Sequence, residues 1–206
     1  MVLVCIGDSL TEGDHGVRGM RGIANVTPVN YPWFLSRMTG AEVRNYGRCG
    51  WRSSDMLRWY KTGAVRVKDA DIVLIMLGTN GGQSMEGDSP ENEAYRQLTA
   101  LIRQDAPDAR IYLCTPPNAT VNPDYSNCGY EPQVRQAAGF VRKYGAESKL
   151  SVIDLARSKR ITPENEAVLQ GNDGLHFTDD GYRVLAEEIL SALKADGFFP
   201  ALGSLR

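Results

Sequence analysis

The run IVLIML, residues Ile72–Leu77, is the most hydrophobic strand candidate in the chain. It contains no polar residue and several β-branched side chains, which favours a strand. A strand that is apolar at every position is typical of the centre of a parallel sheet, because both of its faces are covered. This run therefore predicts a sheet with helices packed on both sides.

Shorter apolar runs alternate with longer amphipathic stretches along the chain, which indicates βαβ units and an α/β fold. We expect strands at Val2–Ile6, Glu42–Tyr46, Ile72–Leu77, Arg110–Cys114 and Ser151–Asp154. We expect helices at Tyr31–Thr39, Ser53–Tyr60, Glu91–Asp105, Glu131–Glu147 and Asp179–Ala195. Ser89 and Thr178 directly precede helices as candidate N-caps.

Length and composition narrow the class of protein. At 206 residues the chain fits one domain, residues 1–206, with a core that needs no disulfide or metal. A net charge of −2 gives no basic surface for nucleic acid or anionic membrane. No apolar stretch is long enough to span a membrane. Met1 leads directly into the first strand, so we expect a cytoplasmic protein, with a trimmed secretion signal left open.

The cysteines Cys5, Cys49, Cys114 and Cys128 lie far apart and form no CxxC pair. This spacing predicts reduced structural thiols rather than a zinc site or a redox motif.

Two short segments supply the groups for nucleophilic catalysis. Ser9 follows the first strand in Gly7–Leu10, and Asp173 and His176 occur together before the last helix. A serine hydroxyl becomes a nucleophile when an imidazole takes its proton, and a carboxylate orients that imidazole. The chain has only two histidines, His15 and His176, which restricts the choice of base.

Gly47 and Asn80 end two further strands. A glycine there can offer its N–H to a ligand without a side chain in the way, and a carboxamide can donate to an oxyanion. Each of these elements alone also fits an ordinary turn. All of them, however, fall at the carboxyl ends of strands or before the final helix, where open parallel sheets bind ligands.

In order and spacing, the four blocks GDSLTEG (7–13), NYG (45–47), GTN (78–80) and DGLH (173–176) resemble those of the GDSL family, the SGNH hydrolases. The resemblance implies a flavodoxin-like, three-layer α/β/α sandwich with five parallel strands in the order 2-1-3-4-5. It implies Ser9 as nucleophile, His176 as base and Asp173 as its orienting partner, with no cofactor and no metal.

The resemblance further implies an oxyanion hole formed by the N–H groups of Ser9 and Gly47 and the side chain of Asn80. Gly81 and Gly82 follow Asn80 where the family often has an acidic residue, which leaves open how Asn80 is supported.

The substrate is expected to be an ester of a small molecule or a saccharide. Arg48, Trp51 and Trp33 lie near the motifs, and aromatic faces beside cationic groups suit a sugar better than a long acyl chain. They predict a short-chain, above all acetyl, esterase acting on a carbohydrate or similar polar alcohol. The loops Gly13–Pro28 and Thr115–Gly129 are expected to border the same cleft and shape the substrate site.

Other functions remain open at this stage. The same fold serves lysophospholipases, thioesterases and acyltransferases. Asp8, Glu12, Asp14 and His15 carry oxygen and imidazole ligands that would suit a divalent ion in a metal-dependent hydrolase. A binding module that has lost catalysis is a further alternative, and the sequence leaves the oligomeric state unknown.

Overall fold

The computed structural model describes residues 1–17, 23–81 and 87–199 of the chain. Its five-stranded sheet has the order β2-β1-β3-β4-β5, and every neighbouring pair is parallel. The strands are β1 (Val2–Gly7), β2 (Glu42–Gly47), β3 (Ile72–Met76), β4 (Arg110–Cys114) and β5 (Ser151–Ile153). The predicted fold class and strand order are confirmed, and no strand end differs from its prediction by more than one residue.

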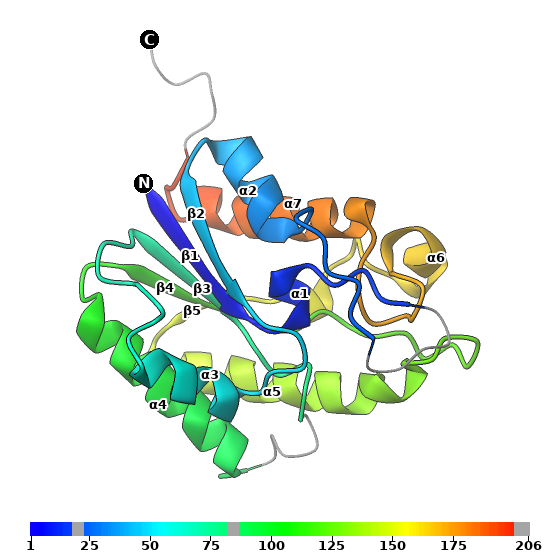
Figure 1. Cartoon of the computed structure of the whole chain (residues 1–206), viewed down its shortest axis with the longest axis horizontal. Helices are drawn as coiled ribbons and strands as arrows, with labels where there is room; N and C mark the ends of the chain where they lie inside the picture. Colours follow the sequence, from blue (N-terminus) through cyan, green and yellow to red (C-terminus); the bar gives the residue numbers. More distant parts are fainter. Residues whose placement is uncertain (18–22, 82–86, 200–206) are drawn as a thin grey trace.

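Helices cover both faces of this sheet (Figure 1). One layer contains α2 (Tyr31–Thr39) and α7 (Asp179–Ala195), and the other contains α3 (Ser53–Lys61), α4 (Pro90–Asp105) and α5 (Glu131–Ser148). The remaining helical segments are short: α1 (Ser9–Glu12), α6 (Glu166–Leu169) and the 3₁₀ turns η2 (Cys128–Tyr130), η3 (Leu155–Arg157) and η4 (Pro163–Asn165).

Two apolar cores result from this layering. Leu3 and Cys5 of β1 pack in the core under α2 and α7, whereas Val4 and Ile6 pack in the core under α3, α4 and α5. Every residue of β3 is buried, because this strand lies at the centre of the sheet and feeds both cores. This central position explains why every residue of β3 is apolar.

Side-chain caps fix where two long helices begin. The Ser89 hydroxyl accepts the N–H of Asn92 at 3.2 Å, and the Thr178 hydroxyl accepts the N–H of Gly181 at 3.1 Å. These caps satisfy N–H groups that have no partner within their helix. The Thr178 cap also fixes the chain two residues after His176.

The parallel strands direct their carboxyl ends toward one edge of the sheet. Ser9 follows β1, residues 48–52 follow β2, and residues 78–81 follow β3 at this edge. The loop after β4 and the segment before α7 reach the same edge. Within the described residues, no helix has the length and apolar character needed to cross a membrane.

Candidate active site

Ser9 is held at the junction of the central strand β1 and the short helix α1. The Asp8 side chain accepts the N–H of Leu10 at 3.1 Å and caps this helix. Gly7 allows the turn because a Cβ at this position would lie 2.0 Å from the Thr11 hydroxyl and 2.6 Å from the Met76 carbonyl. The Ser9 side chain therefore projects from rigid backbone into the cavity at the edge of the sheet.

Asp173, His176 and Ser9 form one chain of hydrogen bonds. Asp173 Oδ2 lies 2.6 Å from His176 Nδ1, and His176 Nε2 lies 2.8 Å from Ser9 Oγ. All three residues are buried. This geometry lets the imidazole take the serine proton through Nε2 while the carboxylate fixes Nδ1. The sequence predicted these three side chains, and the structure brings them together.

The turn around Asp173 is built on its own carboxylate. Oδ1 accepts the N–H groups of Leu175 and His176, each at 3.0 Å. Burial raises the pKa of Asp173, but the hydrogen bond and charge of His176 outweigh it and hold the pKa below its usual value. The carboxylate is thus ionised and oriented before any substrate binds.

Asn127 contacts the triad residue Asp173, and the sequence analysis did not predict this contact. Its Nδ2 donates to Asp173 Oδ2 at 2.8 Å, and its backbone N–H donates to the Asp173 carbonyl at 3.1 Å. It comes from the predicted substrate loop Thr115–Gly129, which has no local pattern that would identify one of its asparagines. Asn127 therefore ties this loop to the orienting carboxylate.

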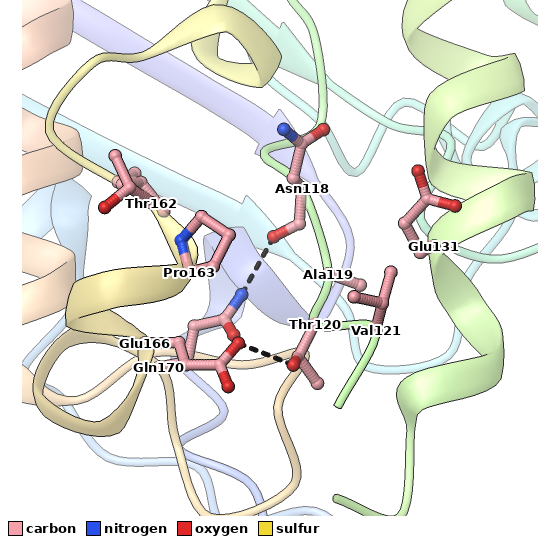
Figure 2. Close-up of a pocket in the computed structure, with 10 residues that line it drawn as sticks. Asn118, Ala119, Thr120, Val121, Glu131, Thr162, Pro163, Glu166 and Gln170 are labelled. Carbon is pink, nitrogen blue, oxygen red and sulfur yellow. Dashed lines mark hydrogen bonds between the residues drawn. The ribbon is translucent and has the colours of Figure 1, made fainter. Parts of the chain in front are cut away.

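A second set of contacts anchors the same loop on its far side (Figure 2). Thr120 Oγ1 donates to Glu166 Oε2 at 2.6 Å, and Gln170 Nε2 donates to the Asn118 carbonyl at 2.9 Å. These residues line a separate cavity of about 190 Å³ that contains none of the Ser9, Asp173 and His176 side chains. The loop is thus fixed between α6 and the triad.

The charge environment of His176 favours its protonated form. Burial lowers the pKa of His176, but the hydrogen bond and charge of Asp173 and the charges of Asp14 and Asp8 raise it above its usual value. Asp14 Oδ2 lies 3.6 Å from His176 Nε2. An imidazole in this setting stabilises the proton that it receives from Ser9.

The predicted oxyanion hole of Ser9, Gly47 and Asn80 agrees with the structure only in part, and Asn80 is placed as expected. Asn80 lines the cavity, and its Nδ2 donates to the Trp51 carbonyl at 3.1 Å. A carboxamide nitrogen carries two hydrogens, so one remains for an oxyanion. The Trp51 carbonyl supplies the support for Asn80 that the sequence left open. Gly82, which also follows Asn80, lies outside the described residues.

The N–H of Gly47 is not free to bind an oxyanion, contrary to the prediction. Its N–H donates to Asn45 Oδ1 at 2.8 Å, and a Cβ at Gly47 would lie 2.1 Å from the Glu12 nitrogen. Gly47 is therefore packed against α1, still paired with Gly7 in the sheet. Gly50 lines the cavity instead. Among the described residues, the N–H groups of Ser9 and Gly50 have no hydrogen-bond acceptor.

The catalytic cavity has a volume of about 200 Å³, below the range usual for drug-sized ligands. Both predicted loops contribute to it, as expected, although residues 18–22 of the first loop lie outside the described part. Ile23 is 52% exposed and marks its outer edge. The lining residues are Ser9, Asp14, Ile23, Ala24, Cys49, Gly50, Asn80, Asn127, Tyr130, Asp173, Leu175 and His176.

Arg48 and Trp51 are absent from the described lining of this cavity, contrary to the prediction that they bind substrate. Arg48 donates to the Gly47 carbonyl at 2.6 Å, and its guanidinium lies 4.6 Å from the ring centre of Trp59. Trp51 packs edge-on against the same ring at 5.3 Å. Both side chains are therefore occupied with packing around α3.

Trp33 also fails to reach the cavity. It lies on α2, is 37% exposed, and lines a separate surface hollow beside Val168 and Thr178. Arg37 covers its ring at 5.2 Å. Trp33 is therefore close to the first loop in the sequence, but its side chain does not line the cavity that contains Ser9.

Three of the four side chains considered for a metal site, those of Asp8, Glu12 and His15, are bound to different partners. Asp8 accepts from the Leu10 N–H, and burial raises its pKa to about 6. Glu12 Oε2 accepts the Cys49 N–H at 2.5 Å, and His15 Nε2 lies 2.9 Å from the Val29 carbonyl. Within the described residues, no three metal-binding side chains form a cluster.

Comparisons with known proteins relate the chain to esterases of known sequence and structure. The curated isoamyl acetate-hydrolyzing esterase of Schizosaccharomyces pombe is 26% identical over 197 residues, covering 93% of this chain and 74% of the relative. The aryl esterase of M. smegmatis matches with a TM-score of 0.74 at 20% identity, over 94% of this chain and 98% of that one.

The carbohydrate acetylesterase Est24 of Sinorhizobium meliloti matches with a TM-score of 0.72 at 17% identity, over 94% of this chain and 98% of that one. These two structures show the shared fold. The model of the GDSL-like lipase/acylhydrolase family matches residues 5–184, which include every proposed catalytic residue. The chain therefore belongs to the GDSL-like lipase/acylhydrolase family and is an esterase of this type.

Proposed function

We propose that this esterase hydrolyses short-chain, above all acetyl, esters of a carbohydrate or similar polar alcohol through an acyl-enzyme on Ser9. The observation that carries the proposal is the small cavity of about 200 Å³ in which Ser9 Oγ lies 2.8 Å from His176 Nε2. A long acyl chain needs a continuous apolar groove. The apolar side chains in the described lining are few: Ile23, Ala24, Leu175 and the ring of Tyr130.

The acylation half of the reaction begins with attack of Ser9 Oγ on the ester carbonyl carbon. His176 Nε2 takes the hydroxyl proton, and the carbonyl oxygen becomes an oxyanion. The side chain of Asn80 and the N–H groups of Ser9 and Gly50 are the donors assigned to this oxyanion. His176 then gives its proton to the leaving alcohol, and the acyl group stays on Ser9.

In the deacylation half, a water molecule gives a proton to His176 Nε2 and attacks the acyl carbonyl. The second oxyanion collapses, the acid leaves, and the proton returns to Ser9. Asp173 stays ionised throughout and holds Nδ1 of the imidazole in place.

Two observations support the choice of acyl and alcohol groups. By their names, the S. pombe relative hydrolyses an acetate ester and the S. meliloti neighbour removes acetyl groups from carbohydrate. The described lining also includes two residues with polar side chains that have no assigned role at the oxyanion, Asn127 and Tyr130. These groups can bind hydroxyls of a sugar-like alcohol.

The acyl preference is tested with p-nitrophenyl esters of graded chain length, from acetate through butyrate to octanoate. We expect kcat/KM for octanoate to be at least about tenfold below that for acetate, because the longer chain does not fit the cavity. The Ser9→Ala variant gives the background rate. A preference for octanoate or longer chains contradicts the proposal and favours a lysophospholipase or thioesterase.

The alcohol preference is tested separately with two acetate esters, an acetylated monosaccharide and isoamyl acetate. We expect the sugar ester to have the higher kcat/KM. A clear preference for isoamyl acetate would remove the carbohydrate part of the proposal and leave the acetyl part intact.

A further inference from the structure

A second carboxylate faces the catalytic imidazole from the side opposite Asp173. Asp14 Oδ2 lies 3.6 Å from His176 Nε2, and the Asp14 side chain is only 5% exposed. The same Nε2 lies 2.8 Å from Ser9 Oγ. His176 therefore has one carboxylate at each ring nitrogen, and the charge of Asp14 is next to the nitrogen that receives the Ser9 proton.

The Asp14 carboxylate is fixed in this position by its other oxygen. Oδ1 accepts the N–H groups of Gly16 and Asn25, each at 2.8 Å. The backbone is held as well, because the Tyr182 hydroxyl donates to the Asp14 carbonyl at 2.5 Å. These contacts hold the carboxylate so that its other oxygen, Oδ2, stays beside Nε2.

A buried charge acts strongly on a neighbour whose own charge changes, because little water screens it. His176 is such a neighbour: it is neutral when it accepts the Ser9 proton and positive immediately afterwards. We propose that Asp14 is an electrostatic positioning residue whose fixed charge stabilises the protonated form of His176 and sets the pH at which the enzyme becomes active. This inference rests on the proposed role of His176 as the base.

The geometry separates this role from a purely structural one. Oδ1 performs the structural task of joining Gly16 and Asn25, whereas Oδ2 faces Nε2. An asparagine at this position keeps the Oδ1 acceptor and removes the charge. Asp14→Asn therefore changes the electrostatic role and leaves the N–H contacts in place.

Other titratable groups also face His176, and they remain unchanged in that variant. Asp173 lies on the same loop, and Asp8 contributes its charge from the end of β1. Burial raises the pKa of the Cys49 thiol, whose Sγ lies 3.8 Å from Asp14 Oδ2, so the thiol adds no charge. The remaining groups on neighbouring elements are Tyr130 of η2, Tyr182 of α7 and the more distant pair Glu12 and Arg48.

The chain contains only two histidines, so NMR can follow the titration of His176 directly. The His176→Ala variant identifies its signal by loss. In Asp14→Asn, we expect the pKa of His176 to fall by about one unit, because removing an anion disfavours the imidazolium. Asp108→Asn is the matched control: it removes the same charge from an exposed position before β4, at the opposite edge of the sheet. We expect it to leave the titration unchanged.

The pH profile of kcat/KM gives the second readout. Its acid limb reports the free enzyme's base, so in Asp14→Asn the limb should move to lower pH by the same amount. The plateau rate should fall several-fold, because a weaker base forms the imidazolium less readily. A structural role alone would lower the rate at every pH and leave the limb where it is.

A second variant keeps the test decisive if the asparagine perturbs folding. Asp14→Ser removes the same charge with a smaller polar side chain. A downward shift of the His176 pKa in the folded variants supports the inference, and an unchanged pKa and acid limb overturn it. Failure of the proposed function is seen separately, because a fluorophosphonate would then not label Ser9 in the unaltered enzyme.

Discussion

The two sides of the catalytic cavity are built in different ways. On the base side, Asp173 and His176 belong to one tight turn, in which Asp173 Oδ1 accepts the N–H groups of residues 175 and 176. On the oxyanion side, Ser9, Gly50 and Asn80 come from three separate strand ends that only the sheet brings together. The comparison teaches that a local turn can form most of one half of a site, whereas the other half depends on the course of the whole backbone.

The largest effect is expected on the base side. Asp173→Asn should lower kcat by roughly 10³- to 10⁴-fold, because the imidazole loses its orienting charge. His176→Ala should remove nearly all turnover. Steady-state kinetics on p-nitrophenyl acetate measure both. A loss in Asp173→Asn smaller than that in Asn80→Ala would reverse the ranking of the two sides.

A smaller effect is expected on the oxyanion side. Asn80→Ala should lower kcat by about a hundredfold or more with little change in KM, because its N–H acts only when the oxyanion forms. Circular dichroism controls for folding, since the lost bond to the Trp51 carbonyl is the structural cost. An unchanged kcat would show that Asn80 is not an oxyanion donor.

The contact between the second loop and the base side should have a more modest effect. Asn127→Ala removes one hydrogen bond to the ionised Asp173, which is worth enough to lower kcat by roughly tenfold. Asn118→Ala is the matched control, because Asn118 lies in the same loop and its side chain donates to the Ala156 carbonyl, away from Asp173. Equal losses in both variants would mean that the loop acts through its overall conformation.

Substitution of Gly47 is expected to have the smallest effect on kcat and to act on stability instead. Gly47→Ala should lower the free energy of unfolding by roughly 1–3 kcal/mol, because its Cβ would overlap the backbone of α1. In Gly50→Ala the added Cβ meets no atom of the described residues within 4 Å, so the expected cost comes from the φ of +74°. Thermal unfolding compares the two. A stable Gly47→Ala variant whose kcat falls as in Asn80→Ala would restore Gly47 as the oxyanion donor.

The same contrast explains which parts of the site could be predicted from the sequence. β3 was recognisable because its apolar residues have no polar interruption, and Asp173 and His176 because they lie three positions apart in one short segment. Gly47 was predicted in place of Gly50 because both are glycines near the end of β2. Only the path of the chain shows that the N–H of Gly47 is bound to Asn45.

The contacts that the two long loops make with the triad could not be predicted from the sequence either. Asn127 and Asp14 reach the triad from two long loops, and loop conformation depends on tertiary packing rather than on local pattern. The prediction that Trp51 and Trp33 bind substrate was wrong because it relied on distance along the sequence. Their positions in the sequence are close to the motifs, but their side chains pack elsewhere.

Covalent labelling of Ser9 tests the proposed acyl-enzyme mechanism most directly. The enzyme is incubated with a fluorophosphonate, and the intact mass and the modified peptide are determined by mass spectrometry. We expect one adduct per chain on Ser9, no adduct in Ser9→Ala and slow labelling in His176→Ala. An active enzyme that remains unlabelled, or is labelled at another residue, would contradict the mechanism.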